Sequence, residues 1–110
     1  MLATVVSHPA PGIATCDAGH KAVSADAGVP TCAVVGYPGL QPLRPSEEHL
    51  PLQAAPGTPL PPICEVLSLV PRHVCPTVNN FSEALLMRGD LILGVESVTA
   101  RGHEAPFSSN

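Results

Sequence analysis

The sequence predicts an all-β domain, a small barrel or sandwich of about eight short strands. The chain has 110 residues, enough for one small domain, and 45% of them are hydrophobic and can fill a core. Fourteen prolines and nine glycines interrupt it, which disfavours long helices and favours short strands joined by turns. No heptad pattern and no internal repeat argues for another architecture.

Short apolar runs follow one another along the chain, separated by turn signals. Asp17–Gly19 reads as a turn, and residues 36–45 and 54–62 read as loops rich in proline and glycine. Strands or short apolar runs are expected at Leu2–Ser7, Ile13–Cys16, Lys21–Ser24, Thr31–Val35, Glu48–Gln53, Ile63–Val70, His73–Val78, Leu85–Met87 and Leu91–Val98.

The later runs carry more detailed expectations. Ile63–Val70 is apolar on both of its faces, which predicts burial on both sides. Arg88-Gly89-Asp90 separates two apolar runs and predicts a hairpin turn; its alternative interpretation is a cell-adhesion tripeptide. Ser82–Met87 could instead form a helical turn. Ala105–Asn110 is a polar tail that we expect to be frayed.

Composition excludes several classes of partner. Five Lys and Arg stand against nine Asp and Glu, and there is no Trp, so a nucleic-acid partner is not expected. No apolar run approaches the roughly 18 residues that span a bilayer, and the start does not resemble a signal peptide. We therefore expect no membrane partner and a cytoplasmic location. The four cysteines form no CxxC pair, so reduced thiols are favoured over two disulfides.

A histidine and a cysteine lie two positions apart in the run from Pro71 to Asn79. On a strand, His73 and Cys75 would point to the same face and supply an imidazole nitrogen and a thiolate, which suit zinc. Two protein ligands leave coordination positions open, which indicates catalysis or substrate binding and not a structural zinc site. The alternative is a buried cysteine beside a half-exposed histidine. Pro76 indicates a defined backbone here.

Four stretches give the chain a resemblance to a known family: Asp17 to Ser24 with Asp26, Gly28 and Pro30; Ser46 to His49; Pro71 to Asn79; and Ala100 to Gly102. Over roughly residues 2 to 103 the chain resembles the C-terminal domain of the D-threonine aldolase and D-serine dehydratase family. These are pyridoxal-phosphate enzymes of the alanine-racemase fold type. The resemblance implies a β domain over residues 1–104, with residues 105–110 as a tail.

The resemblance also implies a metal held by His73 and Cys75. The cysteine favours zinc, although another divalent metal such as manganese serves some members. The metal would act as a Lewis acid on the β-hydroxyl of a small D-β-hydroxy amino acid substrate. Whether the reaction is that of an aldolase or of a dehydratase stays open.

In the family, the lysine that binds pyridoxal phosphate lies in an N-terminal barrel, which is absent from this chain. Lys21 is the only lysine and is expected to be a surface or ion-paired residue. The resemblance therefore implies no catalytic residue here and no lyase activity for the isolated chain. Its implied partner is a barrel domain or a barrel-containing subunit, and the full enzyme would be a homodimer.

Three further residues are second-tier candidates for the active site. Asp17 and His20 could line its mouth, or Asp17 could cap a turn at Gly19, where glycine supplies a conformation that other residues avoid. His49 could be a third metal ligand or a neighbour of the ligands, or part of a polar turn.

A different class of function remains as the alternative. The chain could be a non-catalytic relic β module with a partner-binding face, which would be apolar where it once met the barrel.

Overall fold

The computed structural model describes residues 1–102 and has eight strands and one short helix within them. The chain divides into two compact units, Met1–Thr77 and Val78–Asn110. The all-β expectation is confirmed. His103 and the tail expected at residues 105–110 lie outside the described residues.

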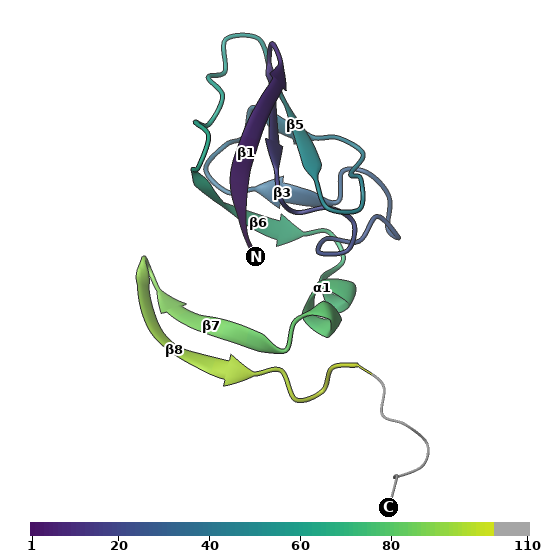
Figure 1. Cartoon of the computed structure of the whole chain (residues 1–110), viewed down its shortest axis with the longest axis vertical. Coiled ribbons are helices and arrows are strands. Elements are labelled where there is room, and N and C mark those ends of the chain that lie inside the picture. The colour runs from purple at the N-terminus through teal and green to yellow at the C-terminus, as the bar shows by residue number, and fades with distance from the viewer. Residues whose placement is uncertain (103–110) are drawn as a thin grey trace, which may run out of the picture. The chain divides into compact units, whose positions relative to one another are not determined.

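The first unit is a six-stranded antiparallel sheet with the strand order β3-β6-β1-β2-β5-β4 (Figure 1). The two edge strands, β3 and β4, also contact each other, so the sheet curls into a nearly closed barrel. Its strands are β1 (Leu2–Ala10), β2 (Ile13–Cys16), β3 (Cys32–Val34), β4 (Leu40–Pro42), β5 (Leu50–Ala54) and β6 (Val66–Pro71).

Strand β1 makes this curvature possible because it pairs with different neighbours along its length. Residues 2–4 pair with β6, whereas residues from Val5 onward pair with β2. The register of the β1–β2 pair shifts between Val5 and Ser7 and again between Ser7 and Ala10. Such irregularities bend a strand and increase its twist. The bent strand can therefore pair with β6 at one end and with β2 at the other as the sheet curls.

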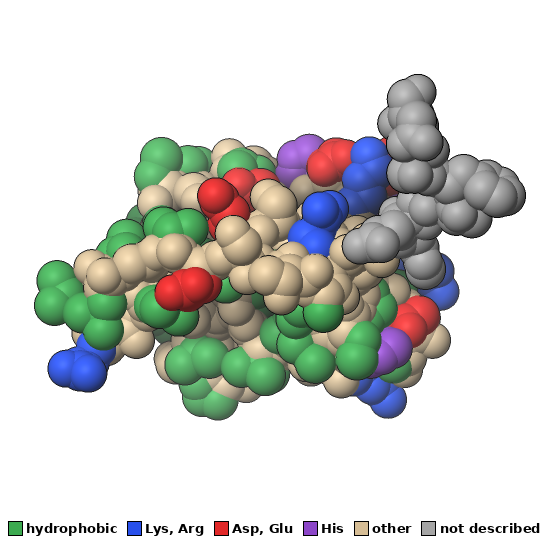
Figure 2. All heavy atoms as spheres, turned by 90° about the horizontal axis from the view of Figure 1, so that it is seen from below, with side chains coloured by type: hydrophobic (Ala, Val, Ile, Leu, Met, Phe, Trp, Pro, Cys, Tyr) green, Lys and Arg blue, Asp and Glu red, His purple; other side chains and the backbone are tan. Residues whose placement is uncertain are grey.

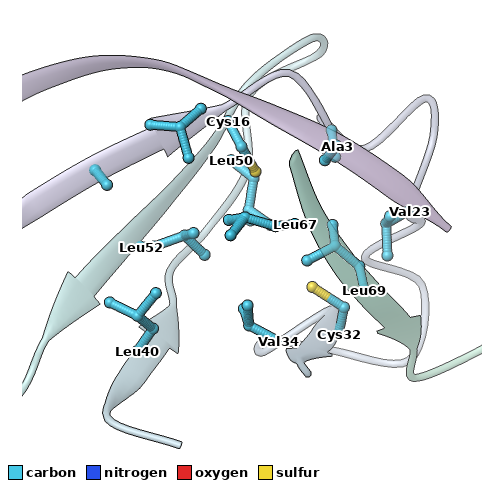
Figure 3. Close-up of a cluster of buried hydrophobic side chains, with 13 residues drawn as sticks. Ala3, Cys16, Val23, Cys32, Val34, Leu40, Leu50, Leu52, Leu67 and Leu69 are labelled. Atoms are coloured by element: carbon cyan, nitrogen blue, oxygen red, sulfur yellow. The ribbon is translucent and has the colours of Figure 1, made fainter. Parts of the chain in front are cut away.

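The core fills the inside of this curled sheet. In Figure 3 side chains from strands distant in the sequence, such as Leu50, Leu52, Leu67 and Leu69, point toward one another. Burial alternates along β3, β4 and β6, as the period of two of a strand requires. The other buried hydrophobic residues are Ala3, Val5, Ala14, Cys16, Ala18, Val23, Cys32, Val34 and Leu40.

The second unit contains an antiparallel hairpin of β7 (Glu83–Arg88) and β8 (Leu91–Ser97). Gly89, with a φ of 59°, and Asp90 form its turn. The expected hairpin is therefore confirmed, and the helical turn at Ser82–Met87 is wrong. Large hydrophobic side chains of this hairpin are exposed. Figure 2 shows hydrophobic side chains in several patches on one face of the molecule. The exposed large hydrophobic residues of the hairpin are Leu85, Leu86, Met87, Leu91, Ile92, Leu93 and Val95.

The strand expected at His73–Val78 is wrong. Strand β6 ends at Pro71, residues 72 and 73 form a bend, and helix α1 runs over Val74–Asn80. Pro76 gives the physical reason. Proline lacks a backbone N–H, and inside a sheet this would remove one hydrogen bond between neighbouring strands. At the third position of a helix no hydrogen bond is lost, because the N–H groups of the first turn have no intrahelical partner.

Other strand boundaries also differ from the expectation. Strand β6 begins at Val66 and not at Ile63, since residues 63 and 64 form a turn in which Cys64 has a φ of 76°. The strand buries Leu67 and Leu69 but exposes Val66 and Val70, so burial on both faces is wrong. Residues 20–22 form a turn and residue 23 a bend where the apolar run at 21–24 was expected, and the loop expected at 36–45 contains β4.

Within residues 1–102, no helix is long and apolar enough to cross a membrane. All four cysteines are free: Cys16 and Cys32 are buried, and Cys64 and Cys75 are exposed. Burial raises the pKa of the Cys16 thiol from its ordinary value of 9.0 to about 11, and burial also raises the pKa of Cys32.

Burial of these thiols predicts a loss of stability at alkaline pH. Above pH 9.0 a thiol of the unfolded chain ionises, whereas Cys16 in the folded chain stays neutral until about pH 11. We therefore expect the free energy of unfolding to fall as the pH rises from 9 toward 11. Urea denaturation at a series of pH values measures this. Cys16→Ala should make the decline less steep, and an unchanged slope in that variant would contradict the assignment.

Candidate functional site

The segment that carries the predicted metal ligands is fixed to the loop that follows β2. The Arg72 amide donates a hydrogen bond to the Thr31 carbonyl at 2.8 Å. On the other side, the Thr77 hydroxyl donates to the Ala22 carbonyl at 2.8 Å, and Thr77 is only 7% exposed. His73 therefore lies on a bend that is anchored at both of its ends.

The same loop supplies a partner for His73. Nδ1 of the imidazole lies 2.5 Å from Oδ2 of Asp26, and the side chains are 41% and 46% exposed. The hydrogen bond from His73 is the main reason why the pKa of the Asp26 carboxyl is lowered; the Ser24 side chain and the Ala27 backbone act in the same direction. The loop thus brings a carboxylate to one nitrogen of the imidazole.

Cys75 is the second residue of α1, and its side chain is exposed with a free thiol. It follows His73 around the bend and does not share a strand face with it, so the geometry expected from a strand is wrong. The expectation that His73 and Cys75 hold a metal remains a prediction. In the part of the chain that the structure describes, no group of three or more His, Cys, Asp or Glu side chains could hold a metal ion.

Two of the sequence stretches singled out above lie against each other. The His20 amide donates to the Ser46 carbonyl at 2.9 Å, and the Lys21 amide donates to the Glu47 carbonyl at 3.3 Å. A Cβ atom on Gly19 would lie 2.2 Å from the Glu47 carbonyl oxygen and 2.4 Å from the Glu48 nitrogen. Gly19 does not have a positive φ, so glycine is required for this close approach and not for its conformational freedom.

Lys21 is ion-paired at the surface, as expected. Its Nζ lies 2.7 Å from Oε1 of Glu48 and 3.6 Å from Oε2 of Glu47. The hydrogen bond with Glu48 raises the pKa of Lys21 and lowers that of Glu48. The two carboxylates thus support the contact between the two stretches.

The second-tier candidates have contacts that stabilise the fold. Oδ1 of Asp17 accepts a hydrogen bond from the Thr4 amide at 2.7 Å, and the Asp17 amide donates to the Thr4 carbonyl at 3.1 Å, which extends the β1–β2 pairing. His20 and His49 are exposed. The His49 amide donates to the Ser46 hydroxyl at 3.2 Å, in a polar turn. Roles of these three residues in a site remain predictions.

No sequence pattern indicates a role for Asp26 or Thr77 in the site. Asp26 belongs to a stretch that carries the family resemblance, but it lies 47 residues before His73. No local periodicity connects residues at that separation. Thr77 falls in the run that was expected to be a strand, where a contact between its hydroxyl and Ala22 would not be anticipated.

Comparisons with known proteins agree on the kind of protein to which this chain is related. A family model described as "Putative serine dehydratase domain" matches residues 1–87. A D-threonine aldolase from Arthrobacter sp is 38% identical over 102 residues, which are 93% of this chain and 26% of that protein.

Two solved structures share the fold. The crystal structure of D-threonine aldolase from Filomicrobium marinum has a TM-score of 0.82 and 36% identity, over 91% of this chain and 27% of its own. The D-threo-3-hydroxyaspartate dehydratase from Delftia sp. HT23 has a TM-score of 0.72 and 27% identity, over 93% of this chain and 32% of its own. The chain thus spans about a quarter to a third of the length of these proteins.

The close approach at Gly19 predicts a severe effect of a single methyl group. Gly19→Ala should lower the free energy of unfolding by about 2 kcal/mol or more, because its Cβ meets backbone atoms that cannot rotate away. Gly94→Ala is the matched control, since a Cβ there meets nothing within 4 Å and its φ is not positive. Thermal unfolding followed by circular dichroism compares the two variants. Equal stability of both would contradict the contact.

Proposed function

Because the chain belongs to the serine dehydratase domain family, we propose that it forms the metal-holding part of the active site of a cytoplasmic lyase. The substrate class is D-β-hydroxy amino acids, and the domain spans residues 1–104. The observation that carries the proposal is the arrangement at the bend. His73 has one ring nitrogen paired with Asp26, and an exposed free thiol follows two residues later.

The donor chemistry of these two side chains fits zinc. A neutral imidazole nitrogen and a thiolate are ligands that zinc prefers, and both side chains are accessible. A ligating histidine usually donates its other N–H to a carboxylate or carbonyl, and the Asp26 carboxylate lies within hydrogen-bond distance of Nδ1 of His73. With two protein ligands, the remaining coordination positions stay open to water or substrate, as in a catalytic site.

The substrate class follows from what the relatives have in common. D-threonine and D-threo-3-hydroxyaspartate, named in the related proteins, are both D-amino acids with a hydroxyl on the β-carbon. A metal bound at His73 and Cys75 would act as a Lewis acid on that hydroxyl. The chain's own contribution is to hold the two ligands on a bend that is anchored at Thr31 and Ala22.

Pyridoxal phosphate belongs to this proposal only through a partner. The cofactor supplies the electron sink of such lyases, and its lysine would come from a barrel domain or barrel-containing subunit. Lys21 is engaged with Glu47 and Glu48, which agrees with a structural role. The chain's match to 26% of the Arthrobacter protein leaves ample length for a barrel there, and the exposed apolar hairpin is suited to contact with a partner.

Zinc binding tests the proposal directly. We expect the wild-type chain to bind zinc in competition with a chromophoric chelator. The double variant His73→Ala, Cys75→Ala should bind it roughly tenfold or more weakly, because both ligands are lost. The double variant His8→Ala, Cys64→Ala removes another exposed His and Cys as a matched control and should bind as the wild type does. Equal zinc binding by all three proteins would refute the proposed site.

The exposed hairpin predicts that the isolated chain associates with itself. Light scattering should detect oligomers of the wild type, and the double variant Leu91→Ser, Leu93→Ser should shift the distribution toward monomer because it removes apolar surface. Val35→Ser changes one exposed apolar residue of the first unit and serves as the control. A wild-type chain that is a clean monomer and binds no zinc would favour the relic module instead.

A further inference from the structure

We infer that Asp26 is a positioning residue: it holds the proton of His73 on Nδ1 and directs Nε2 outward as the nitrogen available to a metal. This inference rests on the proposed function for its metal step, but the tautomer itself is a property of the metal-free chain. Asp26 thereby joins the two predicted ligands in the site, although it lies 47 residues before His73 in the sequence, and it contacts His73 directly.

The tautomer follows from what each group can donate and accept. At neutral pH an aspartate is ionised, and an ionised carboxylate can only accept hydrogen bonds. The Nδ1 atom that lies 2.5 Å from Oδ2 of Asp26 must therefore carry a hydrogen. In a neutral imidazole only one nitrogen carries a hydrogen, so Nε2 has the free lone pair that a metal needs.

The loop that carries Asp26 is built to keep the carboxylate in place. The Asp26 amide donates a hydrogen bond to the Ser24 hydroxyl at 3.2 Å, and the Gly28 amide donates to the Ala25 carbonyl at 3.0 Å. These contacts close a turn around Asp26. Gly28 has a φ of 101°, a backbone conformation that side chains disfavour, and a Cβ there would come within 3.4 Å of Nη1 of Arg72.

The histidine side of the contact is fixed as well. The flanking hydrogen bonds of Arg72 to Thr31 and of Thr77 to Ala22 tie the bend to the same loop. Donor and acceptor are therefore held by one loop and not by two independently moving segments. Because their relative position is set by the fold, the contact needs no metal to form, which is what prior organisation of a ligand requires.

A purely structural tether would predict a different outcome. If the contact only stabilised the bend, its loss would lower stability without a specific change at the imidazole nitrogens. If Asp26 selects the tautomer, its loss changes the proton distribution between Nδ1 and Nε2 in the folded, metal-free protein. The nitrogen chemical shifts of the imidazole report this distribution.

The experiment compares the wild-type chain with Asp26→Ala and Asp26→Asn. Asp90→Asn, in the hairpin turn, is the control for loss of a surface carboxylate. Imidazole ¹⁵N shifts of His73 are measured without metal, and zinc affinity is measured by chelator competition. We expect the wild type and Asp90→Asn to show the Nδ1–H form. Asp26→Ala should show a mixture or the Nε2–H form and bind zinc about 10–100-fold more weakly. Asp26→Asn retains an uncharged acceptor and should fall between them.

The two measurements separate the inference from the proposed function. An unchanged His73 tautomer in folded Asp26→Ala would overturn the inference, as would unchanged zinc affinity in that variant when the wild type binds zinc. If the wild type binds no zinc, the proposed metal site is wrong, and the nitrogen shifts alone decide whether Asp26 sets the tautomer. Circular dichroism of each variant verifies that it is folded.

Discussion

The close backbone contact between Gly19 and Glu47–Glu48 is the constraint on which the rest of the site region depends. It requires a residue without a side chain at position 19, since a Cβ would lie 2.2 Å from a carbonyl oxygen. The hydrogen bonds of His20 and Lys21 to Ser46 and Glu47, and the Lys21–Glu48 ion pair, surround this contact. Together they hold the start of the loop that follows β2 against the segment that leads into β5.

That loop connects the fold to the chemistry. Further along the loop, the Ala22 carbonyl accepts a hydrogen bond from the Thr77 hydroxyl, and the Thr31 carbonyl accepts one from the Arg72 amide. Between them, the Asp26 carboxylate is paired with the His73 imidazole. The bend after β6 therefore takes its position from a loop that is itself held by Gly19. A substitution at Gly19 and one at Asp26 would both disturb His73, the first by displacing the loop and the second by removing a single acceptor.

Sequence patterns predicted the parts of the fold that depend on local alternation and turn chemistry. Strand β2 and the β7–β8 hairpin arise from apolar runs bounded by glycine and aspartate turns, and they were expected at or near their observed places. Local patterns failed where a proline fits two structures. Pro76 is compatible with a strand end and with the first turn of a helix, and the run at His73–Val78 became a bend followed by α1.

The sequence by itself determined the all-β class, which follows from composition and turn chemistry. It also predicts Lys21 as a surface or ion-paired residue and His73 and Cys75 as metal ligands, from their side-chain chemistry and the family resemblance. Only the tertiary structure decided which residues contact these side chains. Asp26 and His73 are 47 residues apart, and their contact exists because a loop closes on a bend through hydrogen bonds to backbone groups. Every residue has a backbone carbonyl, so the sequence does not show which carbonyls will accept these hydrogen bonds. The contact between Asp26 and His73, which depends on them, is therefore visible only in the folded chain.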